Sequence, residues 1–320
     1  MAFRNSKSPG IGTRAIFIKT RPLEGFRSPV FGSSGLPWVC GAWPWAARKT
    51  ASERGMKDSS RREFLKITTA GIAVASLGLP TRGAGEPVLG MIFPPANTPV
   101  PPEAYLMYPS GIRFLATGVG LERMTPEGYD QVVDRIVPAA RSLAAAGANA
   151  IAVMGTSLTF YKGASFNQQL QESISHGTGL PSTTMSTAII EGLKAVGGRR
   201  LAVATAYNDD VSHRLRVFLE ESGFEVLVIK GMGIERFQDR PPVTSEELLN
   251  FSAGVWQTAP KADTLVVSCG ALKTLELLAP LEERCKVPVV SSLPHALWAG
   301  VRLLGLSGRA PGFGRLLSQG

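Results

Sequence analysis

The chain has 320 residues, a formal net charge of +9 and a hydrophobic content of 44%. The charge is unevenly distributed, because residues 1–85 hold 14 Lys and Arg against 4 Asp and Glu, whereas residues 86–320 hold 20 against 21. The basic character therefore belongs to the N-terminal segment, and the nearly neutral remainder does not predict a nucleic-acid partner.

The N-terminal segment divides into two parts. Residues 1–55 are rich in Gly, Pro, Trp and Arg without a helical or strand period, so we expect a disordered extension or an over-extended start and exclude Cys40 from the chemistry. The sequence SRREFLK at 60–66 is followed by an uncharged run of 13 residues at 67–79. Residues 56–85 thus resemble a twin-arginine export signal.

This resemblance implies the twin-arginine translocon as a transient partner during export. It also implies a periplasmic location, or a cytoplasmic one if the signal is not used. The apolar run is too short for a transmembrane span of about 20 residues, so no stable membrane anchor is expected.

From residue 88 onward, apolar runs of strand length alternate with helical stretches. The apolar runs lie at 88–93, 150–154, 200–204, 224–229, 264–267 and 288–290. The helical stretches include 129–145, 188–196, 210–222, 245–258 and 295–304. Glycines at 147, 197 and 223 follow three of these stretches, where helix C-termini favour this residue. The alternation predicts an α/β fold with parallel sheets.

Several common binding motifs are absent from the sequence. No Gly-x-Gly-x-x-Gly follows the first strand and no P-loop occurs, so nucleotide binding has no support. His176, His213 and His295 are scattered, and neither Cys269 nor Cys285 has a partner at metal-ligand spacing. A Gly-x-Ser-x-Gly nucleophile elbow is also missing. We therefore expect no cofactor and no metal.

An internal repeat is the most informative feature of the sequence. The segments 150–158 and 264–272 are both apolar strands that end in small polar residues. Gly155 occupies the position in the first copy that Cys269 occupies in the second. A single thiol is therefore expected to face a glycine.

A second unit extends the repeat, because the segments 179–187 and 286–292 are also similar and each leads into a helix. The repeat predicts two Rossmann-like lobes with parallel sheets, related by a pseudo-two-fold axis, with the active site in the cleft between them. We expect residues 86–196 and 295–320 to form lobe 1 and residues 197–294 to form lobe 2.

Seven segments spread over this region carry a resemblance to one family. They lie at 90–95, 118–130, 154–158, 183–188, 204–210, 268–270 and 311–316. Together they resemble the arylmalonate decarboxylases, within the aspartate/glutamate racemase superfamily. The resemblance covers nearly all of residues 88–317.

The resemblance implies cofactor-independent decarboxylation of an aryl- or alkyl-substituted malonate, a small dicarboxylate. Racemases and maleate isomerases of the superfamily use one cysteine from each lobe, at the positions of Gly155 and Cys269. A two-base racemase needs a proton donor and an acceptor on opposite faces of a planar intermediate. With a single thiol, the resemblance implies one-sided protonation of an enediolate by Cys269.

The same resemblance assigns the residues around the substrate. Without a metal, the enediolate must be held by preorganised hydrogen-bond donors, here a dioxyanion hole. The family positions that supply these donors are Thr156, Ser157, Tyr207 and Gly270. The departing carboxylate would lie in an apolar pocket. The pocket residues implied are Pro94, Pro95, Leu121, Met124, Tyr129, Gly155, Ile234 and Phe237.

The sequence leaves alternatives open. A maleate isomerase or an Asp/Glu-type racemase would need an ionisable partner near Gly155, and a non-catalytic periplasmic binding protein is compatible with export and a cleft. A helix N-terminus would lower the pKa of the Cys269 thiol and an apolar pocket would raise it. Pairing of Cys285 with Cys269 in an oxidising compartment is also open. Ala271 and Met124 differ from the family pattern, so the physiological substrate is not assigned.

Overall fold

A computed structural model describes residues 85–239 and 241–320, all of which belong to a unit that spans Leu77–Gly320. The predictions for residues 1–55, and for the export signal except its last residue, lie outside the described part. Within that part, no helix is long and apolar enough to cross a membrane.

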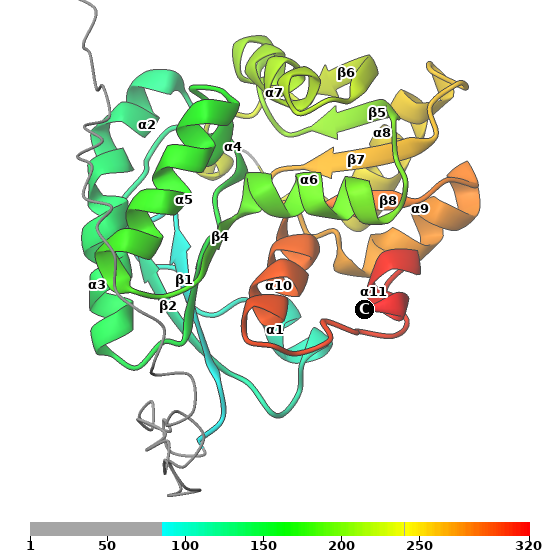
Figure 1. Ribbon diagram of the computed structural model, residues 1–320. Helices are drawn as coiled ribbons and strands as arrows, with labels where there is room; N and C mark the ends of the chain where they lie inside the picture. Colours follow the sequence, from blue (N-terminus) through cyan, green and yellow to red (C-terminus); the bar gives the residue numbers. More distant parts are fainter. Residues whose placement is uncertain (1–84, 240) are drawn as a thin grey trace, which may run out of the picture. The chain divides into compact units, whose positions relative to one another are not determined.

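The described residues form two four-stranded sheets in which all strands are parallel (Figure 1). The first sheet has the order β2-β1-β3-β4 and the second has the order β6-β5-β7-β8. The strands are β1 (Val88–Phe93), β2 (Arg113–Gly118), β3 (Ala150–Val153), β4 (Ser182–Thr184), β5 (Arg200–Thr205), β6 (Glu225–Gly231), β7 (Thr264–Ser268) and β8 (Val289–Ser291). The predicted α/β fold with two parallel sheets is confirmed.

The two sheets repeat the same strand order along the chain. The third strand of each half, β3 or β7, pairs with the first strand of that half on one side and with the fourth on the other. Gly155 follows β3 and Cys269 follows β7, so the two residues hold equivalent places. The repeat found in the sequence is therefore a repeat of structure.

The central strands are covered on both faces, as parallel sheets require. Every residue of β1, β3 and β7 is buried. The edge strands β2 and β6 are only partly buried. Long apolar runs therefore mark the central strands more clearly than the edges.

Eleven α-helices connect or flank the described strands. Six belong to the first half of the chain: α1 (Pro102–Met107), α2 (Pro126–Val132), α3 (Ile136–Ala145), α4 (Thr156–Phe160), α5 (Ala164–Thr178) and α6 (Met185–Ala195). Five follow: α7 (Asp209–Glu221), α8 (Ser245–Gln257), α9 (Leu278–Cys285), α10 (Ser292–Leu303) and α11 (Arg315–Gln319).

The helix expected over residues 129–145 is interrupted. A 3-10 turn at Val133–Arg135 separates α2 from α3. Pro138 accounts for the break, because a proline has no N–H to donate and its ring crowds the carbonyl four residues earlier. A continuous α-helix through this point is therefore disfavoured.

Helices α6 and α10 cross between the two halves. The α6 helix follows β4 of the first sheet but contacts β8 of the second, and α10 follows β8 but packs against β3 and β4. The two helices also pack against each other (Figure 1). Gly300 of α10 lies so close to β1 that an added Cβ would be 2.8 Å from Leu89 Cδ2. This exchange ties the two sheets together.

Two glycines inside helices provide a test of that contact. We expect Gly300→Ala to lower the free energy of unfolding by about 1–2 kcal/mol, because the added methyl group would overpack the fully buried Leu89. Gly254→Ala in α8 is the matched control, since a Cβ there meets nothing within 4 Å. It should raise the free energy of unfolding by about 0.5–1 kcal/mol through helix propensity alone. Urea unfolding measures both, and a stabilising Gly300→Ala would contradict the close α10–β1 contact.

Candidate active site

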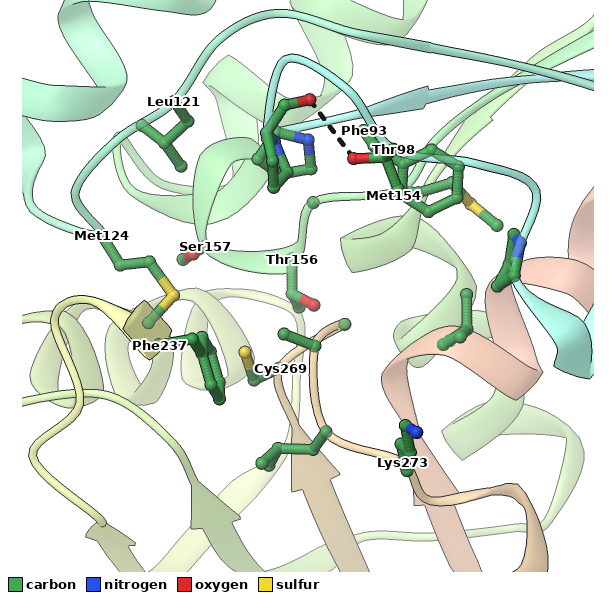
Figure 2. Close-up of a pocket in the computed structure, with 18 of the residues that line it drawn as sticks. Phe93, Thr98, Leu121, Met124, Met154, Thr156, Ser157, Phe237, Cys269 and Lys273 are labelled. Carbon is green, nitrogen blue, oxygen red and sulfur yellow. Dashed lines mark hydrogen bonds between the residues drawn. The ribbon is translucent and has the colours of Figure 1, made fainter. Parts of the chain in front are cut away.

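The carboxyl ends of strands from both sheets line one cavity of about 450 Å³ (Figure 2). From the first sheet, the segment after β1 supplies Pro94 and Pro95, and the segment after β3 supplies residues 154–157. From the second sheet, Tyr207 lies after β5 and residues 269–273 follow β7. The site thus occupies the place where open parallel sheets bind ligands.

Gly155 is closely packed, so a side chain there would require a neighbour to move. It is the N-cap of α4, and an added Cβ would lie 2.6 Å from Pro94 Cγ and 3.3 Å from Leu158 Cβ. The cavity wall at this point is therefore made of backbone and of the Pro94 ring. The residues that follow, 156–160, include no group that ionises near neutral pH.

Cys269 sits on a strained backbone at the opposite strand end. Its side chain is buried, and its φ of 149° lies in a region that residues with a Cβ rarely adopt. Such a conformation costs about 1–3 kcal/mol and persists only where the surroundings hold it. Two hydrogen bonds do so, from Cys269 N–H to Ser292 Oγ at 3.0 Å and from Leu272 N–H to the Cys269 carbonyl oxygen at 3.1 Å.

Burial dominates the chemistry of the thiol. Desolvation raises the pKa of Cys269 to about 11, although the N–H groups of Ala271 and Leu272 and the Tyr207 hydroxyl favour the thiolate and offset part of the rise. No helix begins directly after Cys269, since the next helical turn starts at Leu275. The apolar surroundings therefore outweigh the opposing effects, and the thiol is protonated at neutral pH.

The second described cysteine takes no part in the cavity. Cys285 is buried on α9, and both Cys269 and Cys285 are free thiols. The disulfide left open by the sequence is not formed. Burial also raises the pKa of the Cys285 thiol.

Three residues with hydroxyl groups line the cavity together with Cys269, and Figure 2 shows two of them, Thr156 and Ser157. Thr156 and Ser157 form the first turn of α4, and both are buried. Tyr207 is also buried; its hydroxyl lies 3.3 Å from Ser268 Oγ, and desolvation raises its pKa well above the usual value. Gly270 lines the same cavity, so all four residues predicted to bind a carboxylate lie together there.

The cavity extends to either side of Thr156 and Cys269. Leu121, Met124 and Phe237 lie toward one side in Figure 2, and Phe93, Met154 and Lys273 toward the other. All three residues on the first side were predicted as pocket residues. That side offers an apolar surface.

Tyr129 and Ile234, predicted to line the pocket, are instead buried behind its lining. Among the residues that the structure describes, none lies at normal hydrogen-bond geometry to the Tyr129 hydroxyl. Desolvation raises the pKa of this hydroxyl; the nearby Ser157 hydroxyl lowers it, and Cys269 raises it in smaller measure. Tyr129 therefore lies close enough to Cys269 for the two groups to interact electrostatically, although Tyr129 does not line the cavity.

Charged side chains are confined to the rim. Glu235 pairs with Arg123 at 2.7 Å and accepts a hydrogen bond from Asn208 at 2.9 Å. Lys273 has no ion pair among the residues that the structure describes. In the same range, no three His, Cys, Asp or Glu side chains gather as a metal site would need.

The sequence did not point to every residue of the site. Lys273 and Leu293 line the cavity, and Ser292 bonds to two of its residues. Lys273 lies four residues after Cys269 in a loop at a strand end, and this spacing was the sequence signal that could have placed it at the cavity. His295 does not line the cavity: it is buried in α10, where its Nδ1 accepts a hydrogen bond from Ser291 N–H at 3.0 Å.

Comparison with known proteins identifies the family to which this fold belongs. The family model for arylmalonate decarboxylase matches residues 89–317. The chain belongs to the arylmalonate decarboxylase family. It is 44% identical over 237 residues to the arylmalonate decarboxylase of Bordetella bronchiseptica, covering 74% of this chain and 98% of that protein.

Solved structures of the family agree with this assignment. Unliganded arylmalonate decarboxylase matches with 44% identity and a TM-score of 0.67, over 73% of this chain and all of that one. A liganded double variant with glycine changed to cysteine and cysteine to serine matches with 43% identity and a TM-score of 0.71, over the same shares of the two chains. A Nocardia farcinica maleate cis-trans isomerase shares the fold at 20% identity, with a TM-score of 0.67 over 74% of this chain and all of that one.

The raised pKa of Cys269 can be tested by alkylation. Because the thiolate is the reactive form, iodoacetamide should modify Cys269 at pH 8 about two orders of magnitude more slowly than an ordinary thiol with a pKa of about 8.5. The rate should rise about tenfold per pH unit and level off only near the pKa of about 11. Peptide-resolved mass spectrometry reads Cys269 separately from the other cysteines. Tyr207→Phe should shift the curve to higher pH, because it removes a group that favours the thiolate; a plateau near pH 8 would contradict the assignment.

Proposed function

We propose that the protein decarboxylates an aryl- or alkyl-substituted malonate through an enediolate and that Cys269 protonates this intermediate from one side. One observation carries the proposal. A buried thiol with a pKa of about 11 lines the same cavity as three hydroxyl groups, and the equivalent position of the other half is a glycine. Family membership supports a malonate-type substrate.

The hydroxyl groups of Thr156, Ser157 and Tyr207 hold one carboxylate of the substrate, together with the N–H groups of Ser157 and Gly270. This carboxylate takes up the negative charge that decarboxylation leaves behind. Donors fixed before the reaction stabilise such charge more than water can, by about 3–4 kcal/mol for one well-placed group. Lys273 at the rim favours entry of the dianion.

The second carboxylate lies against Leu121, Met124 and Phe237. An apolar wall solvates a carboxylate poorly and CO2 well, so it favours loss of the charge. The bond between the carboxylate carbon and the α-carbon breaks, its electron pair enters the bound carboxylate as an enediolate, and CO2 leaves. Pro94 and Pro95 border the space for the aryl or alkyl group.

Cys269 then transfers its thiol proton to the α-carbon, and water returns a proton to the thiolate. A pKa of about 11 keeps the donor protonated over the whole physiological range. Gly155 offers no second donor, so the proton arrives on one face only. A maleate isomerase or racemase with a second base on the loop after β3 is disfavoured by the residues at 155–160.

Turnover of phenylmalonate by the full chain, followed as CO2 release, tests the reaction. We expect Cys269→Ala to lower kcat by about 10²–10⁴-fold, since it removes the proton donor. Cys285→Ala, the same change at a buried thiol outside the cavity, should leave kcat unchanged. Absence of turnover in the unmodified protein would favour a binding protein instead. Full activity of Cys269→Ala would show that Cys269 is not the proton donor.

The handedness of the product tests one-sided protonation. With 2-methyl-2-phenylmalonate as substrate, the proton that replaces the carboxylate creates a stereocentre, so we expect one enantiomer in large excess. Chiral chromatography of the product measures the ratio. A racemic product would show that protonation occurs from solvent or from both faces.

We also propose that the protein is exported by the twin-arginine translocon and acts in the periplasm. The paired arginines at 61 and 62 and the uncharged run at 67–79 support this proposal. In a host with this pathway, changing both arginines to lysine should retain the protein in the cytoplasm, as fractionation would show. Arg54→Lys, a conservative change outside the motif, should leave the distribution unaltered. Equal periplasmic amounts of all three proteins would contradict export by this route.

A further inference from the structure

One buried hydroxyl group joins the two loops that carry the proposed chemistry. Ser292 is the first residue of α10 and is completely buried. Its Oγ accepts hydrogen bonds from Thr156 Oγ1 at 2.9 Å and from Cys269 N–H at 3.0 Å. Thr156 follows β3 of the first sheet and Cys269 follows β7 of the second. We propose that Ser292 is a positioning residue that sets the proton donor and the carboxylate-binding hydroxyl relative to each other. This inference rests on the proposed function.

The bond to Cys269 controls the place of the thiol. With φ at 149°, the Cys269 backbone is in a conformation that is not favoured by the residue itself. Its N–H needs an acceptor because the residue is buried. Ser292 Oγ is the acceptor among the described residues. Loss of this hydroxyl group would leave the N–H unpaired and free the backbone that aims the thiol.

The bond to Thr156 determines the direction in which the Thr156 hydroxyl group donates its hydrogen bond. Each of the two hydroxyl groups has one proton, and in this structure Thr156 donates to Ser292. A bound carboxylate needs Thr156 to donate to it instead. Rotation of both hydroxyl groups satisfies this, since Ser292 then donates to Thr156 Oγ1 and Thr156 donates to the carboxylate. No other described group accepts a hydrogen bond from Ser292, so its proton is available for this role.

The result is a continuous chain of donors from one half of the molecule to the other. Cys269 N–H donates to Ser292, Ser292 to Thr156, and Thr156 to the carboxylate. Each bond polarises the next, so the chain strengthens the last bond as charge develops on the enediolate. No proton is transferred along this chain. Ser292 acts through Thr156 and Cys269 and does not contact the substrate.

Ser291 provides a matched control for the loss of a hydroxyl group. It precedes Ser292, is equally buried, and its Oγ accepts a hydrogen bond from Thr274 Oγ1 at 3.0 Å. Neither Ser291 nor Thr274 lines the cavity. We expect Ser292→Ala to lower kcat for phenylmalonate by about ten- to a hundredfold, with a smaller change in KM, because misplaced groups weaken the transition state most. Ser291→Ala should keep kcat within about twofold of the unmodified protein. Urea unfolding of both variants separates this effect from a general loss of stability.

Valine and threonine at position 292 isolate the hydroxyl group from its volume. The two side chains have nearly the same shape, so any strain from the added methyl group is common to both. Ser292→Thr should be at least about tenfold more active than Ser292→Val. Equal activity of these two variants, or a kcat of Ser292→Ala that matches Ser291→Ala, would overturn the proposal.

A second readout does not depend on turnover. If Ser292 holds the Cys269 backbone, Ser292→Ala should raise the alkylation rate of Cys269 by iodoacetamide severalfold at fixed pH, while Ser291→Ala leaves it unchanged. If the unmodified protein has no decarboxylase activity but the two variants still differ in alkylation rate, the proposed function is contradicted and the positioning of the thiol by Ser292 is supported. Identical alkylation rates in the two variants would overturn the positioning itself.

Discussion

The exchange of two helices is the constraint on which the site depends. Two parallel sheets can share one cavity only if their carboxyl ends are held toward each other. Here α6 leaves the first sheet to contact the second, and α10 leaves the second to pack on β3 and β4 of the first. The start of α10 carries Ser292 and the body of α10 carries Gly300, where an added Cβ would collide with Leu89 of β1. One helix therefore connects the packing of the core to the geometry of the cavity.

Burial governs the electrostatics of the cavity more than charge does. The pKa of the Cys269 thiol and that of the Tyr207 hydroxyl are both raised, with desolvation as the main cause. Both groups are consequently neutral donors, and the ionised residues stay at the rim. A dianionic substrate that enters such a space loses much of its hydration. In the proposed binding mode, hydroxyl and N–H groups compensate for that loss at one carboxylate, whereas the apolar wall leaves the other uncompensated, which makes the two carboxylates chemically different.

The sequence allowed much of this arrangement to be predicted because the repeat and the buried strands have strong local signals. The central strands are continuous apolar runs, and the comparison of residues 150–158 with 264–272 placed Gly155 and Cys269 at equivalent strand ends. The edge strand β2 was missed because its apolar run, residues 114–116, is only three residues long, and α5 because its buried face is small and includes Asn167. These elements lack the periodicity on which such predictions depend.

The finer structure of the site could not be predicted for a different reason. Ser292 contacts Thr156 across 136 residues and Cys269 across 23, and nothing in the local sequence marks a serine with such partners. Tyr129 and Ile234 lie one layer behind the lining, and resemblance to a family does not separate a lining residue from its support. The pKa of Cys269 is set by desolvation, which raises it, and by hydrogen bonds, which lower it; the degree of burial that decides between them cannot be read from the sequence.

The difference between the two halves extends beyond one residue. Strand pairing makes Pro94 of the first half equivalent to Ala206 of the second, because Ile92 pairs with Val153 and Ala204 pairs with Val267. The Pro94 ring lies 2.6 Å from where a Cβ at Gly155 would be, whereas the small, buried Ala206 directly follows β5 and donates its N–H to the Ser268 carbonyl oxygen at 3.3 Å. In each half, a larger residue at one of these two strand ends thus accompanies a smaller residue at the other. A side chain at position 155 requires Pro94 to move, so the asymmetry on which the proposed one-sided protonation depends extends to pairs of adjacent strand ends.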